Sequence, residues 1–222
     1  MDPALELEET YFARFQDEAK RSLVWKELSR YFQQWIDPHS AVLDLGAGYC
    51  EFINNIQAKQ KYAMDLNPTT AAKARSDVTV ISQDVTLKWP VESSSIDVVF
   101  SSNFLEHIPT KNGLMNCLRE ANRVLKSDGK LILLGPNIRF CSDVYWDFFD
   151  HHLPLSDRSA VEALGLAGFE AQKVIERFLP FTMQGGQPAH PILIRAYLML
   201  PVAWLVLGKQ FLIIARKARA PR

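Results

Sequence analysis

A short apolar run that ends in two closely spaced glycines restricts the possible folds of this chain more than any other feature. Residues 41–45, Ala-Val-Leu-Asp-Leu, indicate a buried strand, and Gly46 and Gly48 follow it in a tight loop. Glycine lets the backbone adopt positive φ and pass close to a ligand. A helix predicted from Glu51 to about Lys59 begins at once, so its free N–H groups face the same crevice. This order is typical of an open α/β sheet.

Further strand-like segments alternate with helical ones along the rest of the first 137 residues. Val98-Val99-Phe100 is continuously apolar, as expected of a strand covered on both faces. Asp128-Gly129 is predicted as a turn. The predicted strands are residues 62–65, 78–85, 96–101 and 131–134, and the predicted helices between them are residues 68–75 and 113–126. The alternation predicts an α/β, Rossmann-like, doubly wound sheet that is mostly parallel, with right-handed crossovers.

Segments on either side of this core complete the predicted single domain of residues 1–222. An N-terminal helical cap is predicted within residues 1–39, with its helix at 8–36, and the ligand-binding core within 40–137. Residues 138–222 form the predicted acceptor side. It comprises irregular structure at 140–156, a helix at 159–167, a sixth strand at 169–178, an apolar helical insertion at 181–208 and an antiparallel seventh strand at 211–215.

Composition narrows the class of protein further. The chain has 222 residues, and its 25 Lys and Arg balance 25 Asp and Glu, so a nucleic-acid partner is not expected. Cys50, Cys117 and Cys141 are widely spaced and odd in number, which favours free thiols over disulfides or zinc. The acidic N-terminus lacks the pattern of a signal peptide, so we expect a cytoplasmic protein.

The glycine loop discriminates between two kinds of cofactor. A dinucleotide site requires G-x-G-x-x-G, but the third position here is Glu51. Asp44, two residues before the first glycine, would repel a pyrophosphate, whereas a sulfonium cofactor with an α-ammonium group would tolerate it. The loop therefore argues against a nicotinamide-dependent oxidoreductase, which stays a rival hypothesis.

At these residues the chain resembles the class I S-adenosylmethionine (SAM)-dependent methyltransferase family over roughly residues 40–137. The resemblance implies SAM as the cofactor. It assigns Asp44 to Gly48 to the first motif, Asp65 to the ribose hydroxyls, residues 83–85 to the adenine and residues 96–103 to the fourth-strand motif. The implied cofactor-binding residues are Asp44, Gly46, Gly48, Asp65, Leu66, Asp84, Val85 and Asn103. The chain departs from many members of the family at Cys50, where they have glycine.

Structural roles are the alternative for three of these carboxylates. Asp44 is suited to capping a turn, and Asp65 precedes Asn67-Pro68, which suits the start of a helix. Asp84 has the simpler alternative of a carboxylate at the end of a strand.

Two clusters are candidates for the chemistry of methyl transfer, which needs a base only when the acceptor is protonated. The first is residues 103–107, in which His107 either acts as a general base or packs against the cofactor. No metal site is predicted, although some relatives bind a divalent cation near a Glu-His pair similar to Glu106-His107. The second is residues 145–152, in which Asp150 and His151 either deprotonate a hydroxyl or lie on a lid helix.

The apolar stretch of residues 191–208 leaves several possibilities open. It is too short for a membrane-spanning helix and contains Pro201, so we expect a broken helix pair. That pair covers the acceptor site, forms a homodimer face or touches a membrane surface as a peripheral contact. The leading hypothesis is a SAM-dependent methyltransferase that acts on a small-molecule, glycan or lipid-linked acceptor, at oxygen. The alternative is a non-catalytic module that binds a partner through this insertion.

Overall fold

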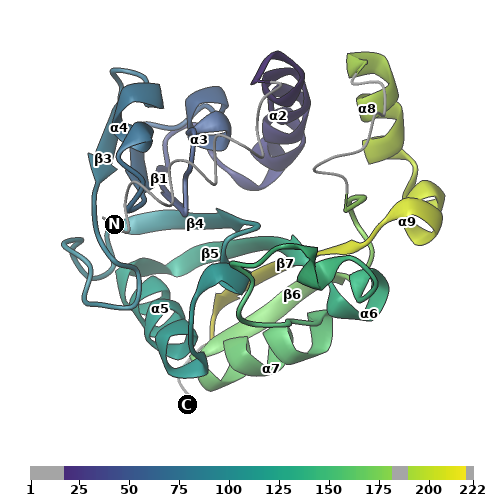
Figure 1. Cartoon of the computed structure of the whole chain (residues 1–222). Coiled ribbons are helices and arrows are strands. Elements are labelled where there is room, and N and C mark those ends of the chain that lie inside the picture. The colour runs from purple at the N-terminus through teal and green to yellow at the C-terminus, as the bar shows by residue number, and fades with distance from the viewer. Residues whose placement is uncertain (1–17, 182–189, 219–222) are drawn as a thin grey trace.

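A seven-stranded sheet lies at the centre of the molecule (Figure 1). The computed structural model describes residues 18–181 and 190–218. The strand order is β3-β2-β1-β4-β5-β7-β6. The first five strands in this order are parallel, and β7 is antiparallel to both of its neighbours. The strands are β1 (Ala41–Leu45), β2 (Gln60–Met64), β3 (Val78–Ile81), β4 (Ile96–Ser102), β5 (Leu125–Pro136), β6 (Phe169–Ile175) and β7 (Gln210–Lys217). The predicted fold class, including the antiparallel last strand, is confirmed.

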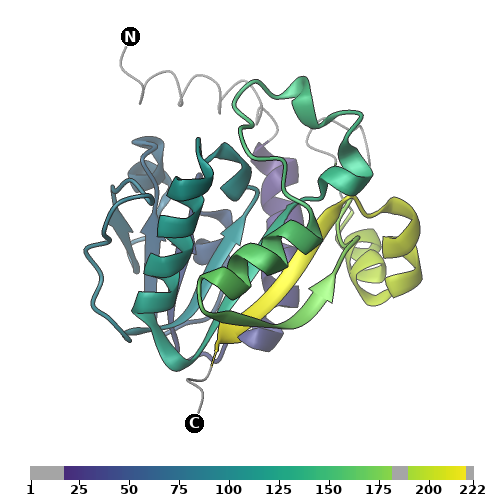
Figure 2. The ribbon, with the colours of Figure 1, turned by 90° about the horizontal axis from the view of Figure 1, so that it is seen from below.

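Helices cover both faces of the sheet and enclose two apolar cores (Figures 1 and 2). Helices α5 (Lys111–Val124) and α7 (Asp157–Leu166) pack on one face. The other face carries α2 (Glu18–Phe32), α3 (Glu51–Asn55), α8 (Pro191–Met199) and α9 (Pro201–Leu207). The shorter elements are α4 (Thr69–Lys73), α6 (Ile138–Cys141) and the 3-10 turns η1 (Gln33–Trp35), η2 (Leu105–His107) and η3 (Tyr145–Asp147).

Three element boundaries differ from the sequence prediction for identifiable reasons. β3 ends at Ile81 rather than Val85, because the Asp84 carboxylate accepts hydrogen bonds from the N–H and hydroxyl of Thr86 and so closes a turn. The predicted turn at Asp128-Gly129 lies within β5, where an irregularity in the pairing with β4 absorbs the extra residues. The predicted helix at 8–36 ends at Phe32 and continues as a 3-10 turn, and residues 8–17 lie outside the described residues.

The apolar insertion is a helix pair broken at Pro201, as predicted. The Tyr197 hydroxyl donates to the Phe178 carbonyl at 2.6 Å, and the Trp204 indole N–H donates to the Tyr197 carbonyl at 2.8 Å. The first contact joins α8 to the segment that follows β6, and the second joins α9 to α8. Among the described residues, every helix is too short or too polar to cross a membrane.

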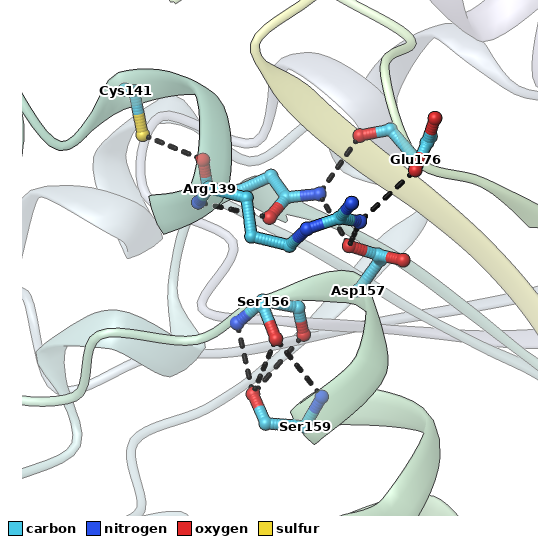
Figure 3. Close-up of polar contacts among 7 residues, drawn as sticks. Arg139, Cys141, Ser156, Asp157, Ser159 and Glu176 are labelled. Atoms are coloured by element: carbon cyan, nitrogen blue, oxygen red, sulfur yellow. Dashed lines mark hydrogen bonds and ion pairs between the residues drawn. The ribbon is translucent and has the colours of Figure 1, made fainter.

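A polar network around the buried Asn137 fixes the chain where it leaves β5 (Figure 3). The fully buried Asn137 side chain donates to the Asp157 carboxylate at 2.8 Å and to the Glu176 carbonyl at 2.9 Å. Arg139 donates to the carboxylates of Asp157 and Glu176 at 2.8 and 3.0 Å. Because every partner is satisfied, α6, α7 and the end of β6 are held together, and the loop of residues 142–153 begins from a rigid base.

Candidate functional site

The glycine loop turns sharply at the carboxyl end of β1. Gly46 and Gly48 have φ values of 70° and 51°, and Cys50, at the start of α3, has a φ of 60°. Glycine enters this left-handed region most readily, so Cys50 holds a backbone conformation that few other residue types adopt. The Gly46 N–H donates to the Met64 carbonyl at 2.9 Å, and the Thr70 hydroxyl donates to the Gly48 carbonyl at 2.8 Å. The loop is thus anchored to the neighbouring β2 and α4.

Three carboxylates converge at this loop. Asp44 is 3% exposed, and burial, the Asp65 charge and the Glu51 charge raise its pKa well above the usual range, against a hydrogen bond from the Ile53 backbone. Burial also raises the pKa of Asp65, although the N–H of Gly48 donates to its carboxylate at 2.7 Å. Burial raises the pKa of Glu51, against the nearby Arg21 guanidinium. Such a crevice favours a cationic ligand, because a cation stabilises the ionised carboxylates.

The N-terminal helix contributes residues to this crevice that the sequence prediction missed. Arg21 and Trp25 of α2 line it together with Asp44, Gly46 and Ser102. The Arg21 guanidinium lies 2.6 Å from the Glu51 carboxylate, which joins α2 to α3. Neither residue belongs to a recognisable motif, and α2 is far from the loop in sequence, so tertiary packing alone brings them there.

The crevice is almost closed in this conformation, with a cavity of about 30 Å³. The Phe104 ring lies directly over Gly46, so close that a Cβ at position 46 would meet its atoms at 2.2 Å. The larger cavity, of about 460 Å³, lies at the opposite edge of the sheet near Trp35, Asp97 and Lys126. That cavity is at the amino ends of the strands, so its size does not indicate the ligand site.

The remaining predicted cofactor residues lie around the carboxyl edge in different settings. Leu66, next to Asp65, is 48% exposed. Asn103 follows β4 with a φ of 48°, a conformation that asparagine tolerates better than most residues, and its N–H donates to the Leu134 carbonyl. Asp84 is used in the turn with Thr86, and the side chain of Val85 is buried in the core. The cofactor contacts of all four stay predictions.

The structure brings the two predicted catalytic clusters into one. His107 Nδ1 lies 3.0 Å from the Asp150 carboxylate and 3.1 Å from the Asp150 carbonyl. The N–H groups of His152 and Leu153 both donate to the Glu106 carbonyl, which holds residues 150–153 against η2. The carboxylate of Asp150 therefore pairs with His107, a pairing that the sequence prediction did not include.

Electrostatics set the protonation of His107. Burial lowers its pKa, but the hydrogen bond to Asp150 and the charges of Glu106 and Asp150 outweigh burial and raise it above the usual value. The charge of His107 partly offsets the burial that raises the pKa of Asp65. The His107–Asp150 pair therefore lies within electrostatic reach of the glycine-loop crevice. A histidine whose Nδ1 faces a carboxylate is suited to act as a general base.

His151 is buried next to this pair. It is 7% exposed, and its ring stacks on Phe148 with centroids 5.0 Å apart and lies 5.0 Å from the His107 ring. Ligand atoms of Glu106, His107 and His151 lie within 4.8 Å of one another. Two imidazoles and a carboxylate are a donor set that suits a transition metal. The predicted absence of a metal stays a prediction.

Replacing Gly46 with alanine should displace the Phe104 ring and force alanine into the left-handed region, at a cost of at least about 1–2 kcal/mol of stability. Gly165 is the matched control, because it lies within α7 and a Cβ added there would meet no atom within 4 Å. Gly165→Ala should stabilise the protein by about 0.5–1 kcal/mol. Thermal unfolding of both variants measures the difference, and equal unfolding temperatures would contradict the geometry assigned to the loop.

Comparisons with known proteins identify methyltransferases as similar to this chain. A family model described as "Methyltransferase domain" matches residues 43–133. A protein of Encephalitozoon cuniculi that is named as a methyltransferase is 29% identical over 140 residues, which are 60% of this chain and 65% of that protein. The match thus spans less than two thirds of that relative's length.

Two solved structures share the fold at low sequence identity. A SAM-dependent methyltransferase from Archaeoglobus fulgidus has a TM-score of 0.65 and 18% identity, over 86% of this chain and 92% of its own. A chain from the complex between the Haloferax volcanii Trm112 methyltransferase activator and a methyltransferase has a TM-score of 0.68 and 14% identity, over 94% of this chain and 98% of its own. At these identities the likeness concerns the fold.

Proposed function

We propose that this chain is a class I SAM-dependent methyltransferase and that it methylates a hydroxyl oxygen of a small-molecule, glycan or lipid-linked acceptor. The observation that carries the proposal is the His107–Asp150 pair, with 3.0 Å between Nδ1 and the carboxylate. A transfer to an already unprotonated nitrogen needs no base, whereas a hydroxyl does. An oriented base beside the cofactor crevice therefore favours oxygen.

The residues at the crevice fit SAM by their chemistry. Asp44, Asp65 and Glu51 would favour its cationic groups, and the tight glycine loop lets its backbone approach the ligand closely. When bound, SAM supplies an activated methyl group for the acceptor oxygen. Because Phe104 covers Gly46, its ring must rotate away for the cofactor to enter.

His107 would take the proton that the acceptor hydroxyl loses. The Asp150 carboxylate accepts the Nδ1–H, which leaves Nε2 as the basic nitrogen. Nε2 would take the O–H proton as the oxygen is methylated, S-adenosylhomocysteine would be the leaving group, and Asp150 would stabilise the imidazolium that results. Phe149 is fully exposed and Trp146 is 59% exposed on the same loop, so both are available to stack on a sugar ring or a lipid-linked substrate.

Calorimetric titration with S-adenosylhomocysteine, with NADH as the control, tests the cofactor. Micromolar binding of S-adenosylhomocysteine alone supports the proposal, because the missing third glycine and the acidic crevice disfavour NADH. Failure of both to bind would favour the non-catalytic module that acts through residues 191–208. Binding of NADH alone would favour the oxidoreductase.

A metal is a second route for deprotonating the acceptor, favoured by the donor set of Glu106, His107 and His151. A chelator separates the two routes in a methyl-transfer assay. Transfer that withstands EDTA supports His107 as the base. Transfer that EDTA abolishes and a divalent cation restores would assign the three side chains to a metal instead.

A further inference from the structure

We propose that the outer face of the α8–α9 helix pair docks the protein onto the surface of an anionic lipid membrane. This inference concerns where the protein works and does not rest on the proposed reaction. Its basis is the combination of an exposed apolar surface with a chain segment that carries positive charge and no negative charge.

The outer face of the pair is apolar and exposed. Trp204 and Leu198 turn inward and are 8% and 5% exposed. The helices are also apolar on the side that faces away from the protein. A stable helix that is apolar on all sides normally has an apolar environment on each side. The outward side chains, each at least half exposed, are Ile192, Leu193, Met199, Leu200, Val202, Leu205, Val206 and Leu207. Such a concentration within one short segment exceeds the scattered apolar residues of an ordinary surface.

The charge of the surrounding segment selects the partner. The chain as a whole has balanced charges, yet after Glu176 the sequence contains no aspartate or glutamate. Three of the basic residues in this stretch, Arg177, Arg195 and Lys209, lie at the helix pair. Arg216 and Lys217 lie at the opposite end of β7 and do not contribute to this face. An apolar face flanked by basic side chains matches an anionic lipid surface, which attracts nearby Lys and Arg.

Arg195, within α8, takes part in an ion-pair cluster that has an excess of positive charge. Arg195 forms two hydrogen bonds with the buried Glu27 carboxylate, at 2.6 and 2.9 Å. Arg30 also lies 2.8 Å from that carboxylate, so two guanidinium groups share one negative charge. Their side chains are 51% and 55% exposed and therefore reach solvent beside the helix pair. A second copy of this chain docked on this face would carry the same excess positive charge, whereas an anionic lipid surface offers the opposite charge.

The helix pair is tied to the loop that carries Asp150. Lys209, just after α9, lies 3.4 Å from the Asp143 carboxylate, and the Phe148 and Phe181 rings are 5.8 Å apart. In Figures 1 and 2, α6 at the start of this loop lies beside α9. A protein seated on lipid through α8–α9 would hold this loop near the membrane surface.

Flotation with phospholipid vesicles tests the proposal. The whole protein should bind vesicles of phosphatidylcholine with phosphatidylglycerol at least tenfold more tightly than vesicles of phosphatidylcholine alone. The double variant Val202→Glu, Val206→Glu changes two outward residues of α9 that are 73% and 70% exposed, and it should lose at least tenfold in binding. Leu166→Glu, 72% exposed on α7, is the matched control and should bind as the wild type does.

Fold and cofactor binding are checked separately in the same samples. The double variant should keep the unfolding temperature and the S-adenosylhomocysteine affinity of the wild type, so a failure of docking is distinguishable from a failure of the proposed function. Two outcomes would overturn the proposal. One is wild-type protein that ignores anionic vesicles. The other is a wild-type dimer, seen by light scattering, that the double variant dissociates, which would assign the face to a second copy.

Discussion

Replacing Asp44 with asparagine should weaken SAM binding by on the order of 10- to 100-fold, because a hydrogen bond to a charged group contributes roughly 1.5–3 kcal/mol. The same change should make the empty protein more stable at pH 8. Asp44 is buried and close to Asp65 and Glu51, so its ionised form is costly without a cationic ligand. Asparagine keeps the shape and an oxygen for the Ile53 N–H, but it carries no charge.

The pH dependence of this effect has a definite sign. The pKa of Asp44 is raised in the folded state, so the folded chain holds the proton more tightly than the unfolded chain does. The empty wild-type protein therefore loses stability as the pH rises from the unfolded pKa through the raised folded pKa. The advantage of Asp44→Asn should be full at pH 8 and should shrink as the pH falls. The affinity of the wild type for SAM should instead increase with pH, because SAM binding requires ionised carboxylates in the crevice.

Asp77→Asn is the matched control for this experiment. Asp77 is 58% exposed, far from the crevice, and the hydrogen bond from Lys61 lowers its pKa. Its removal should leave SAM affinity unchanged and should cost stability above the unfolded pKa, the opposite sign to Asp44→Asn, because the buried Lys61 ammonium loses its carboxylate partner. Calorimetric titration and thermal unfolding at pH 5 and pH 8 measure both variants. A gain of about 1 kcal/mol shifts the unfolding temperature by about 2–4 °C in a chain of this size. An Asp44→Asn protein with wild-type affinity would remove Asp44 from the cofactor site.

The fold was accessible from the sequence because its signals are local. Buried parallel strands are continuous apolar runs, as at Val98-Val99-Phe100, and the glycines after β1 mark the crevice in the sequence itself. Errors occurred where side-chain hydrogen bonds or pairing irregularities decide the boundary. The turn that Asp84 forms with Thr86 shortens β3, and the irregular pairing of β5 with β4 absorbs the Asp128-Gly129 turn.

The catalytic arrangement was less accessible because it joins distant segments. His107 and Asp150 were each recognised as candidates, but 43 residues separate them in sequence, and nothing local predicts that their side chains meet. The sequence prediction paired Asp150 with its neighbour His151, and the ring of His151 packs against Tyr145 and Phe148. Arg21 and Trp25 escaped notice for the same reason, since only the packing of α2 brings them to the crevice.

Replacing His107 with glutamine should lower methyl transfer to a hydroxyl acceptor by about 10²–10⁴-fold, which is the usual contribution of a general base. Glutamine retains a group that can hydrogen-bond Asp150, so the loop should stay in place and S-adenosylhomocysteine affinity should not change. The assay measures transfer of a labelled methyl group from SAM into fractionated sugars and lipid-linked saccharides. A purely structural role for His107 would instead lower the unfolding temperature and leave the rate unchanged.

Asp150→Asn separates the positioning of the base from its chemistry. The Asp150 carboxylate raises the pKa of His107, so the variant should lower that pKa and move the acidic limb of the kcat/KM profile to lower pH. Its plateau should also fall, because a less basic and less well oriented imidazole accepts the proton less readily. The pKa of His107 is measurable without the acceptor, by NMR titration of histidine-labelled protein. An unchanged His107 pKa in Asp150→Asn would show that the pair does not form in solution, and the assignment of His107 as an oriented base would fail with it.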